Sequence, residues 1–174
     1  MLIGFIIIIL TLGFDQLTKY LASTLIPLNS PHIVWIPGVL EITYSQNTGM
    51  SFGLLEGRQG LFMLATVIAL AIFGYLFYYS DFKHKKVYSI AMALFISGTL
   101  GNAIDRALYG YVIDFMNFPF VDAFLNFFKL PGFTNNWADM YLSAAIVLFA
   151  LDLFIFEEKR KKKEVAKPHE DIES

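Results

Sequence analysis

The stretch Gly60–Ser80, "GLFMLATVIALAIFGYLFYYS", contains no charged residue and decides the class of fold. A helix that crosses a bilayer needs about 20 predominantly apolar residues, and this stretch has that length. The whole chain has the same character, because 56% of its 174 residues are hydrophobic and its mean hydropathy is +0.57. Soluble domains rarely have such a composition. The sequence therefore predicts a single-domain integral membrane protein.

Three more segments are long and apolar enough to span a membrane. Two follow this stretch, at residues 87–104 and 137–156, and the third, at about residues 1–25, begins "MLIGFIIIILTLGF". The first segment could also be a cleaved signal peptide, but it lacks a basic start and a small-residue cleavage site. We therefore predict an α-helical membrane protein with four transmembrane helices, at about 1–25, 60–80, 87–104 and 137–156, in one domain covering residues 1–156.

Basic residues are concentrated in two segments, the loop "DFKHKK" at 81–86 and the tail 157–174. Nine of the 13 basic residues lie there: Lys83, Lys85, Lys86, Lys159, Arg160, Lys161, Lys162, Lys163 and Lys167. Because Lys and Arg mark cytoplasmic loops, both termini are expected in the cytoplasm. The connections 23–59 and 105–136 are then extracytoplasmic. We expect the tail to be a disordered topology anchor.

Both extracytoplasmic connections contain structural signals. Residues 32–46, "HIVWIPGVLEITYSQ", form two apolar runs separated by Pro37-Gly38, which predicts a small β-hairpin or sheet. Residues 120–133, "FVDAFLNFFKLPGF", place apolar side chains at helical spacing. This segment could be a helix in the outer membrane interface or a loop helix packed on the hairpin.

Two carboxylates are expected at the same membrane depth. Asp114, in "GYVIDF", follows the outer end of the third span, and Asp139 begins the fourth. Two such acids in a partly dry site share one proton, so that one activates a water while the other hydrogen-bonds the carbonyl under attack. This is aspartic protease chemistry. The structural alternative is that each acid pairs with a basic neighbour such as Arg106 or, for Asp139, caps a helix.

Other polar residues are expected in the same layer. Asp15 and Lys19 are four residues apart on the first helix, and Asn102 and Arg106 have the same spacing on the third. Each pair could simply hold the bundle together, which we favour for Asp15 and Lys19. The guanidinium of Arg106 could instead hold a substrate carbonyl.

Other catalytic chemistries have weaker support. The chain has no cysteine, which excludes thiolate chemistry. Residues 49–53, "GMSFG", match the nucleophile motif of serine hydrolases, but that motif belongs in an α/β sheet, so a Ser51 nucleophile, alone or with Lys19, is not expected. The three histidines lack zinc-ligand spacing.

Five short motifs carry a resemblance to a known family. They are "DQLTK" at 15–19, "NTGMSFG" at 47–53, "GNAIDR" at 101–106, "YVIDF" at 111–115 and "NNWAD" at 135–139. In this order on four spans, the chain resembles the lipoprotein signal peptidases, or signal peptidase II. Departures from the common pattern are Met50, Ser51, Asn135 and a long connection after Phe115.

The resemblance implies a bacterial inner-membrane aspartic endopeptidase. Such an enzyme removes the signal peptide of diacylglyceryl-modified prolipoproteins before the lipidated cysteine. The resemblance makes Asp114 and Asp139 the catalytic pair. It places the following residues around substrate or site: Asn47, Gly49, Asn102, Arg106, Asn136, Asp105, Asp15 and Lys19. Expected partners are these precursors and membrane phospholipids, without nucleic acid, metal or cofactor, and the chain is expected to be monomeric with its site near the outer leaflet boundary.

Two other functions make different predictions. A small transporter or proton relay would distribute its acids through the depth of the membrane. A non-enzymatic assembly factor would bind a partner through the outer hairpin and would tolerate Asp114→Asn.

Overall fold

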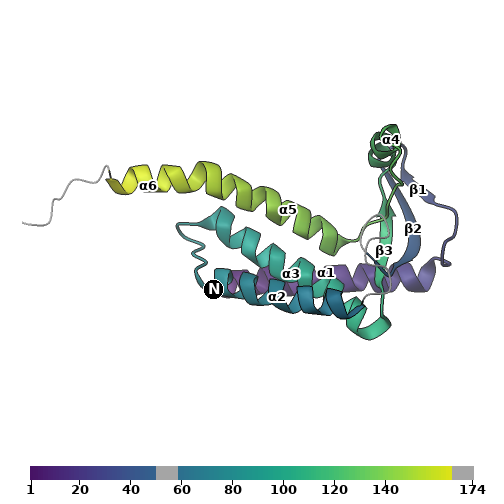
Figure 1. Ribbon diagram of the computed structural model, residues 1–174, viewed down its shortest axis with the longest axis horizontal. Coiled ribbons are helices and arrows are strands. Elements are labelled where there is room, and N and C mark those ends of the chain that lie inside the picture. Colours follow the sequence, from purple (N-terminus) through teal and green to yellow (C-terminus); the bar gives the residue numbers. More distant parts are fainter. Residues whose placement is uncertain (50–58, 166–174) are drawn as a thin grey trace, which may run out of the picture.

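The computed structural model describes residues 1–49 and 59–165. Its long helices are α1 (Leu2–Leu25), α2 (Gln59–Tyr78), α3 (Lys86–Tyr109) and α5 (Trp137–Leu151), the last continued by the π-helical segment η2 (Asp152–Phe156) and α6 (Glu157–Val165). Four helices in this part of the chain are long and apolar enough to cross a membrane, which confirms the predicted number of spans. They run up and down in sequence order, so that α1 begins and α6 ends at the same end of the bundle (Figure 1).

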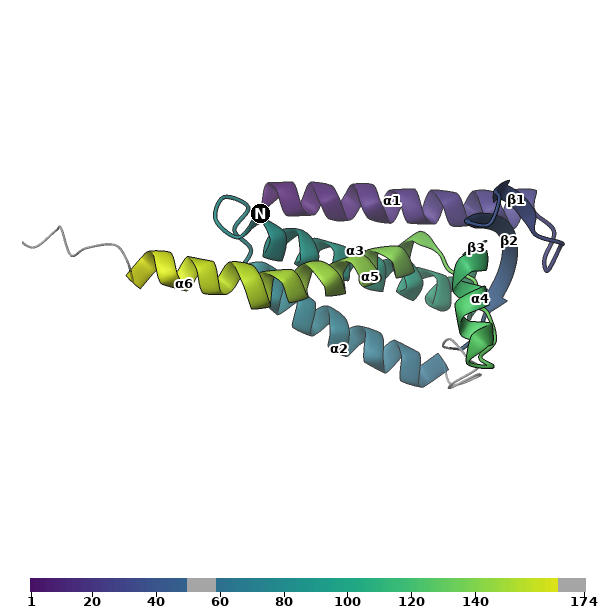
Figure 2. The same ribbon diagram turned by 90° about the horizontal axis from the view of Figure 1, so that it is seen from above.

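Helix α3 is the central helix of the bundle, and α1, α2 and α5 pack around it (Figure 2). In the most apolar 18 residues of α3, 50% of the residues are buried, whereas in the corresponding stretch of α2 only 6% are buried. Small residues and aromatic rings fill the contacts: Ala91 and Ala93 are fully buried, and the rings of Phe73 and Phe95 stack with centroids 4.3 Å apart. The outward faces of the surrounding helices are apolar, as a lipid environment requires.

Two helix ends differ from the prediction. Helix α3 continues past residue 104 to Tyr109, where Gly110, with φ of +80°, ends it in the left-handed conformation. The helix of the fourth span does not stop at residue 156 but continues through η2 into α6, so the predicted disorder is wrong for residues 157–165. There Lys161 pairs with Glu157 one turn away at 2.7 Å, a spacing that supports a helix. Residues 166–174 lie outside the described residues.

A three-stranded antiparallel sheet covers one end of the bundle (Figure 1). The predicted hairpin is present as β1 (Ile33–Ile36) and β2 (Leu40–Asn47), with Gly38 at φ of +71° in its turn. The third strand, β3 (Val112–Asn117), pairs with β2 and was not predicted. Every residue of β3 is buried, so it lacks the polar alternation that marks a strand with one solvated face.

The short helix α4 (Pro119–Phe127) lies beside the sheet, beyond the end of the bundle (Figure 2). The expected loop helix is therefore present. None of its residues is buried, which argues against tight packing on the hairpin. Phe120, Phe124 and Phe127 are 58%, 64% and 81% exposed. Such a face suits the membrane interface, and that location stays a prediction.

The close contact between α3 and α5 depends on Gly98. A Cβ atom at this position would lie 2.6 Å from the carbonyl oxygen of Ala138 and 2.7 Å from Cγ of Leu142. We expect Gly98→Ala to lower the free energy of unfolding in detergent by about 1–3 kcal/mol, because the two helices must separate. Gly74→Ala in α2 is the matched control, since no described atom lies within 4 Å of its new Cβ. Equal unfolding midpoints for Gly98→Ala and wild type would contradict this packing.

Candidate active site

Strand β3 and the start of α5 are held together by backbone hydrogen bonds. The N–H of Asn135 donates to the carbonyl of Met116 at 2.8 Å, and the N–H groups of Phe115 and Met116 both donate to the carbonyl of Asn135 at 2.9 Å. Asp114 lies on this strand, opposite Ser45 of β2. Asn136, the next residue after Asn135, is the N-cap of α5. This bridge therefore positions Asp114 close to the helix start that carries Asp139.

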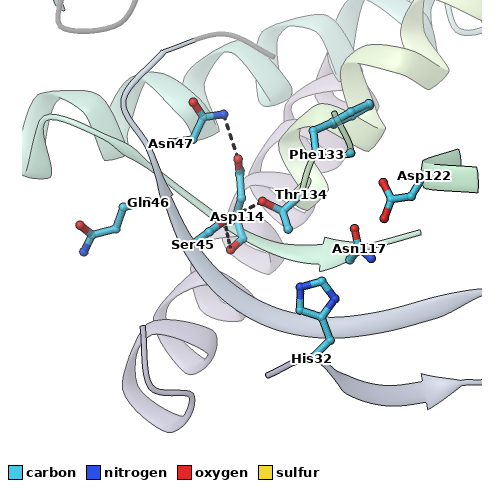
Figure 3. A pocket seen from close by; sticks show the side chains of 10 residues that line it. His32, Ser45, Gln46, Asn47, Asp114, Asn117, Asp122, Phe133 and Thr134 are labelled. Carbon is cyan, nitrogen blue, oxygen red and sulfur yellow. Dashed lines mark hydrogen bonds between the residues drawn. The ribbon is translucent and has the colours of Figure 1, made fainter. Parts of the chain in front are cut away.

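Asp114 is 1% exposed and held by two amides. Its Oδ1 accepts from Asn136 Nδ2 at 2.6 Å. Its Oδ2 accepts from Asn47 Nδ2 at 3.0 Å (Figure 3). Burial, reinforced by the nearby charge of Asp139, raises the pKa of Asp114 to about 7. A carboxyl group with such a pKa can hold or release a proton near neutral pH.

Asp139 is bonded to the same polar cluster. Its Oδ1 accepts from Asn102 Nδ2 at 2.7 Å, and its Oδ2 accepts from the backbone N–H of Asn136 at 3.3 Å. The second contact completes a capping box at the start of α5, so the capping role considered for this acid is real. Asn136 Nδ2 also donates to Asn102 Oδ1 at 3.1 Å. Asn136 and Asn102 thus link the two carboxylates through hydrogen bonds.

The other structural alternative, an ion pair with Arg106, is not observed. Within residues 1–49 and 59–165, no carboxylate oxygen lies within 4.0 Å of its guanidinium. Arg106 instead stacks over the Phe62 ring, with Cζ 4.5 Å from the centroid, and Nη2 lies 3.4 Å from the carbonyl of Gly49. Its buried Nε has no acceptor in the described part of the chain.

Lys19 connects α1 to α3 beneath this cluster. Its ammonium lies 3.0 Å from Asp15 Oδ2, from Asp105 Oδ2 and from Asn102 Oδ1. Lys19, Asp15 and Asp105 are each 1% exposed or less. The predicted pair of Asp15 and Lys19 is present, but the network extends further. Asp105 also accepts from the N–H of Ile113 at 3.0 Å, which ties α3 to the strand of Asp114.

Some members of this network could not be found from the sequence. Gln16 Nε2 donates to the carbonyl of Gly101 and to Asp105 Oδ1, both at 3.1 Å. Asn135 acts through its backbone, and Phe62 supports Arg106 from another helix. Gln16 belongs to the motif "DQLTK" and Asn135 to "NNWAD". Their contacts reach other segments of the chain, so spacing along one helix does not predict them.

Two adjoining hollows open on the carboxylates. One of about 470 Å³ is lined by Asp114, and one of about 410 Å³ is lined by Asp139, Asn102 and Arg106. Asn47, Phe133 and Thr134 line both hollows. Figure 3 shows Asp114 between β2 and the segment with Phe133 and Thr134. An extended chain crossing this shared wall would meet both acids.

The remaining catalytic candidates have different positions. Ser51 lies outside the described residues. His32 lines the hollow of Asp114, closer to the acid than the sequence indicated, but its Nδ1 lies 2.7 Å from Glu41 Oε2. In the described ranges no three His, Asp or Glu side chains form a group that could hold a metal ion. Asp152 follows α5 at the end of the bundle away from the sheet, beside Lys83 and Lys86, and Arg160 binds it there. No described acid connects the two ends.

Comparisons with known proteins identify the family of this chain. A family profile described as signal peptidase (SPase) II matches residues 7–155. The lipoprotein signal peptidase of Latilactobacillus sakei subsp. sakei (strain 23K) is 35% identical over 91% of this chain and 97% of its own. That of Staphylococcus aureus (strain bovine RF122 / ET3-1) is 34% identical over 87% of this chain and 88% of its own.

Two solved bacterial membrane enzymes have a similar fold. One has a TM-score of 0.72 and 29% sequence identity, and the match covers 98% of this chain and 94% of the solved chain. The other also has a TM-score of 0.72, with 31% identity, and covers 87% of this chain and 92% of its own. The profile match, the relatives and the shared membrane fold together show that this chain is a multi-pass bacterial membrane protease of the signal peptidase II family.

Proposed function

We propose that this protease is an aspartic endopeptidase that removes the signal peptide from diacylglyceryl-modified prolipoproteins, cleaving before the lipidated cysteine. The observation that carries the proposal is the position of two acids: Asp114 and Asp139 line adjoining hollows and are linked through Asn136 and Asn102. The raised pKa of Asp114, about 7, supports a pair that shares one proton at neutral pH.

The pair would act as general base and general acid. The ionised carboxylate removes a proton from a water molecule, whose oxygen attacks the scissile carbonyl carbon. The protonated carboxyl group donates to the carbonyl oxygen and gives a tetrahedral intermediate. When the intermediate collapses, the C–N bond breaks and the leaving amine receives a proton from the carboxyl group that took one from water, while the other carboxylate takes back the proton that it gave to the carbonyl oxygen. Side chains of Asn47, Asn102 and Asn136 keep both carboxylates in place by donating to them.

The other site residues would have binding and supporting roles. Arg106 is suited to hold a substrate carbonyl, because its buried Nε–H has no acceptor among the described residues and its ring contact with Phe62 fixes the guanidinium. Gly49 extends the wall of the hollow beside Asn47, and its backbone N–H donates to Asn47 Oδ1 at 3.0 Å. The network of Lys19, Asp15 and Asp105 would support the site without touching substrate.

The position of the site suits a substrate anchored in the membrane. The acids lie at the sheet end of the bundle, and the basic loop 81–86 and α6 lie at the other end (Figure 1). With the basic end in the cytoplasm, both termini are cytoplasmic and the pair lies at the outer boundary of the membrane. A precursor held by its acyl chains and signal helix would reach this depth laterally among the phospholipids. One chain supplies both acids, which supports a monomer.

The shared proton leads to a pH prediction. Above the pKa of about 7 for Asp114, the pair loses its proton, both carboxylates are charged, and no acid remains for the carbonyl oxygen. We therefore expect kcat/KM for precursor cleavage to fall as the pH rises above about 7, and circular dichroism should show that the fold persists. A rate that increases as the pH rises above 7 would contradict a pair sharing one proton.

The proposed function is tested by cleavage in detergent micelles. Wild-type enzyme should cleave a prolipoprotein that carries the diacylglyceryl group, and EDTA should not slow the reaction. The matched control is the same precursor before lipid transfer, which should be cleaved far more slowly. Cleavage of both precursors at equal rates would contradict the lipid requirement, and no cleavage of either would contradict the proposed substrate.

A further inference from the structure

A second site is suggested by a basic pocket at the end of the bundle opposite the sheet. The pocket has a volume of about 440 Å³ and lies between the loop that follows α2 and the segments η2 and α6. Lys83 and Lys86 line it from the loop side, and Lys159 and Lys162 line it from α6. All four are exposed. Among the side chains that the structure describes, which on α6 end at Lys162, none places a carboxylate oxygen within 4.0 Å of these four ammonium groups.

The carboxylate that lines this pocket is already engaged. Asp152 is 3% exposed, and its two oxygens accept from Arg160 Nη1 at 2.9 Å and from Nη2 at 2.7 Å. Nearby, Asp81 is also occupied, because its Oδ1 accepts from the backbone of Lys83 and its Oδ2 lies 2.7 Å from His84 Nδ1. The excess positive charge of the four lysines is therefore left for a ligand.

The pocket has a built floor rather than a surface of mobile lysines. Asp152 begins the π-helical segment η2, a rare geometry that is frequent at functional sites. Arg160 reaches back across this segment to Asp152, and such a two-bond pair fixes both side chains. The buried pair thus sets the position of α6 and of its two lysines.

We infer that this pocket binds the phosphate-bearing headgroup of an anionic glycerophospholipid. Lys86 begins the third candidate span and Lys162 ends the fourth, so the pocket lies at the depth of lipid headgroups. Lysines attract phosphate as point charges, and basic pockets between transmembrane helices bind such headgroups. Val87 and Phe156 add an apolar wall beside them, which suits the glycerol and acyl part of a lipid. This inference is independent of the catalytic mechanism.

The test measures lipid binding to the full chain in neutral detergent by native mass spectrometry. Probes are dioleoyl phosphatidylglycerol, zwitterionic dioleoyl phosphatidylcholine and inorganic phosphate. Wild type should bind one phosphatidylglycerol about tenfold or more tightly than phosphatidylcholine. Lys86→Gln/Lys162→Gln should lose most of this preference. Lys85→Gln/Lys161→Gln should keep it, because it removes the same charge from adjacent positions that do not line the pocket.

Three results would overturn the inference. Equal binding of the two lipids by wild type would remove the preference for anionic headgroups. An equal loss in both double variants would mean that general positive charge, rather than the pocket, attracts the lipid. Inorganic phosphate that binds as tightly as phosphatidylglycerol would identify a soluble anion as the ligand. If the pocket variant does not fold, Lys83→Gln/Lys159→Gln removes the other two lysines of the pocket in its place and should lose most of the preference.

Discussion

Replacing Asp114 with asparagine is expected to lower cleavage of lipidated precursor by about 10²–10⁴-fold. An amide cannot take a proton from water and return it to the leaving amine. The change also disturbs the local bonds, because Asn136 and Asn47 donate to both oxygens of Asp114, and asparagine offers one oxygen. The measurement is kcat/KM in micelles, with substrate binding followed separately.

The matched control is Asp122→Asn. Asp122 lines the same hollow as Asp114, but it lies on α4, outside the linked pair. This variant makes the same chemical change in the same hollow and should keep wild-type turnover. If Asp122→Asn were inactive and Asp114→Asn active, the acids would have been assigned to the wrong roles.

Replacing Lys19 with alanine is expected to have the largest effect on stability. Its ammonium lies 3.0 Å from Asp15 and from Asp105, and all three side chains are buried. Removing the ammonium leaves the buried carboxylates of Asp15 and Asp105 without their cationic partner, which should lower the free energy of unfolding by about 3–5 kcal/mol. The free energy of unfolding in detergent measures this loss. Activity should fall only in part. Asn102 loses the hydrogen bond from Lys19, but its Nδ2 still donates to Asp139.

The exposed lysine Lys85 provides the control, because Lys85→Ala removes the same charge from the surface and should leave unfolding unchanged. Adding Asp105→Asn to Lys19→Ala should restore part of the stability, since one of the two charges is then neutralised. A Lys19→Ala protein with wild-type stability would show that the buried network does not hold α1 against α3. If folded Lys19→Ala lost all cleavage while Asp114→Asn and Asp139→Asn both remained active, Lys19 would be the catalytic group.

The transmembrane part of the fold could be predicted because hydropathy is a local signal. The third strand could not, because β3 pairs with β2, which precedes it by two transmembrane helices, and both its faces are buried. Charge composition predicted a disordered tail from residue 157. The bonds of Arg160 to Asp152, and of Lys161 to Glu157, favour a helix there instead.

The candidate site was predictable at the level of motifs and not at the level of contacts. Topology alone brought Asp114 and Asp139 to one level, and spacing of four residues predicted the pair of Asp15 and Lys19. The contact of Lys19 with Asp105 joins two helices, and the bridge from Asn135 to Met116 joins a strand to a loop. Such contacts depend on packing between distant segments, which no short window of sequence contains.

The most direct test of the central proposal is a double-mutant cycle on the two acids. Asp114→Asn, Asp139→Asn and the double variant are compared with wild type in one micelle preparation, with EDTA present and folding checked by circular dichroism. Because the two acids would work as one proton-sharing unit, each single variant should be nearly as inactive as the double variant. Single variants that keep substantial cleavage, or losses that multiply in the double variant, would contradict a catalytic pair formed by Asp114 and Asp139.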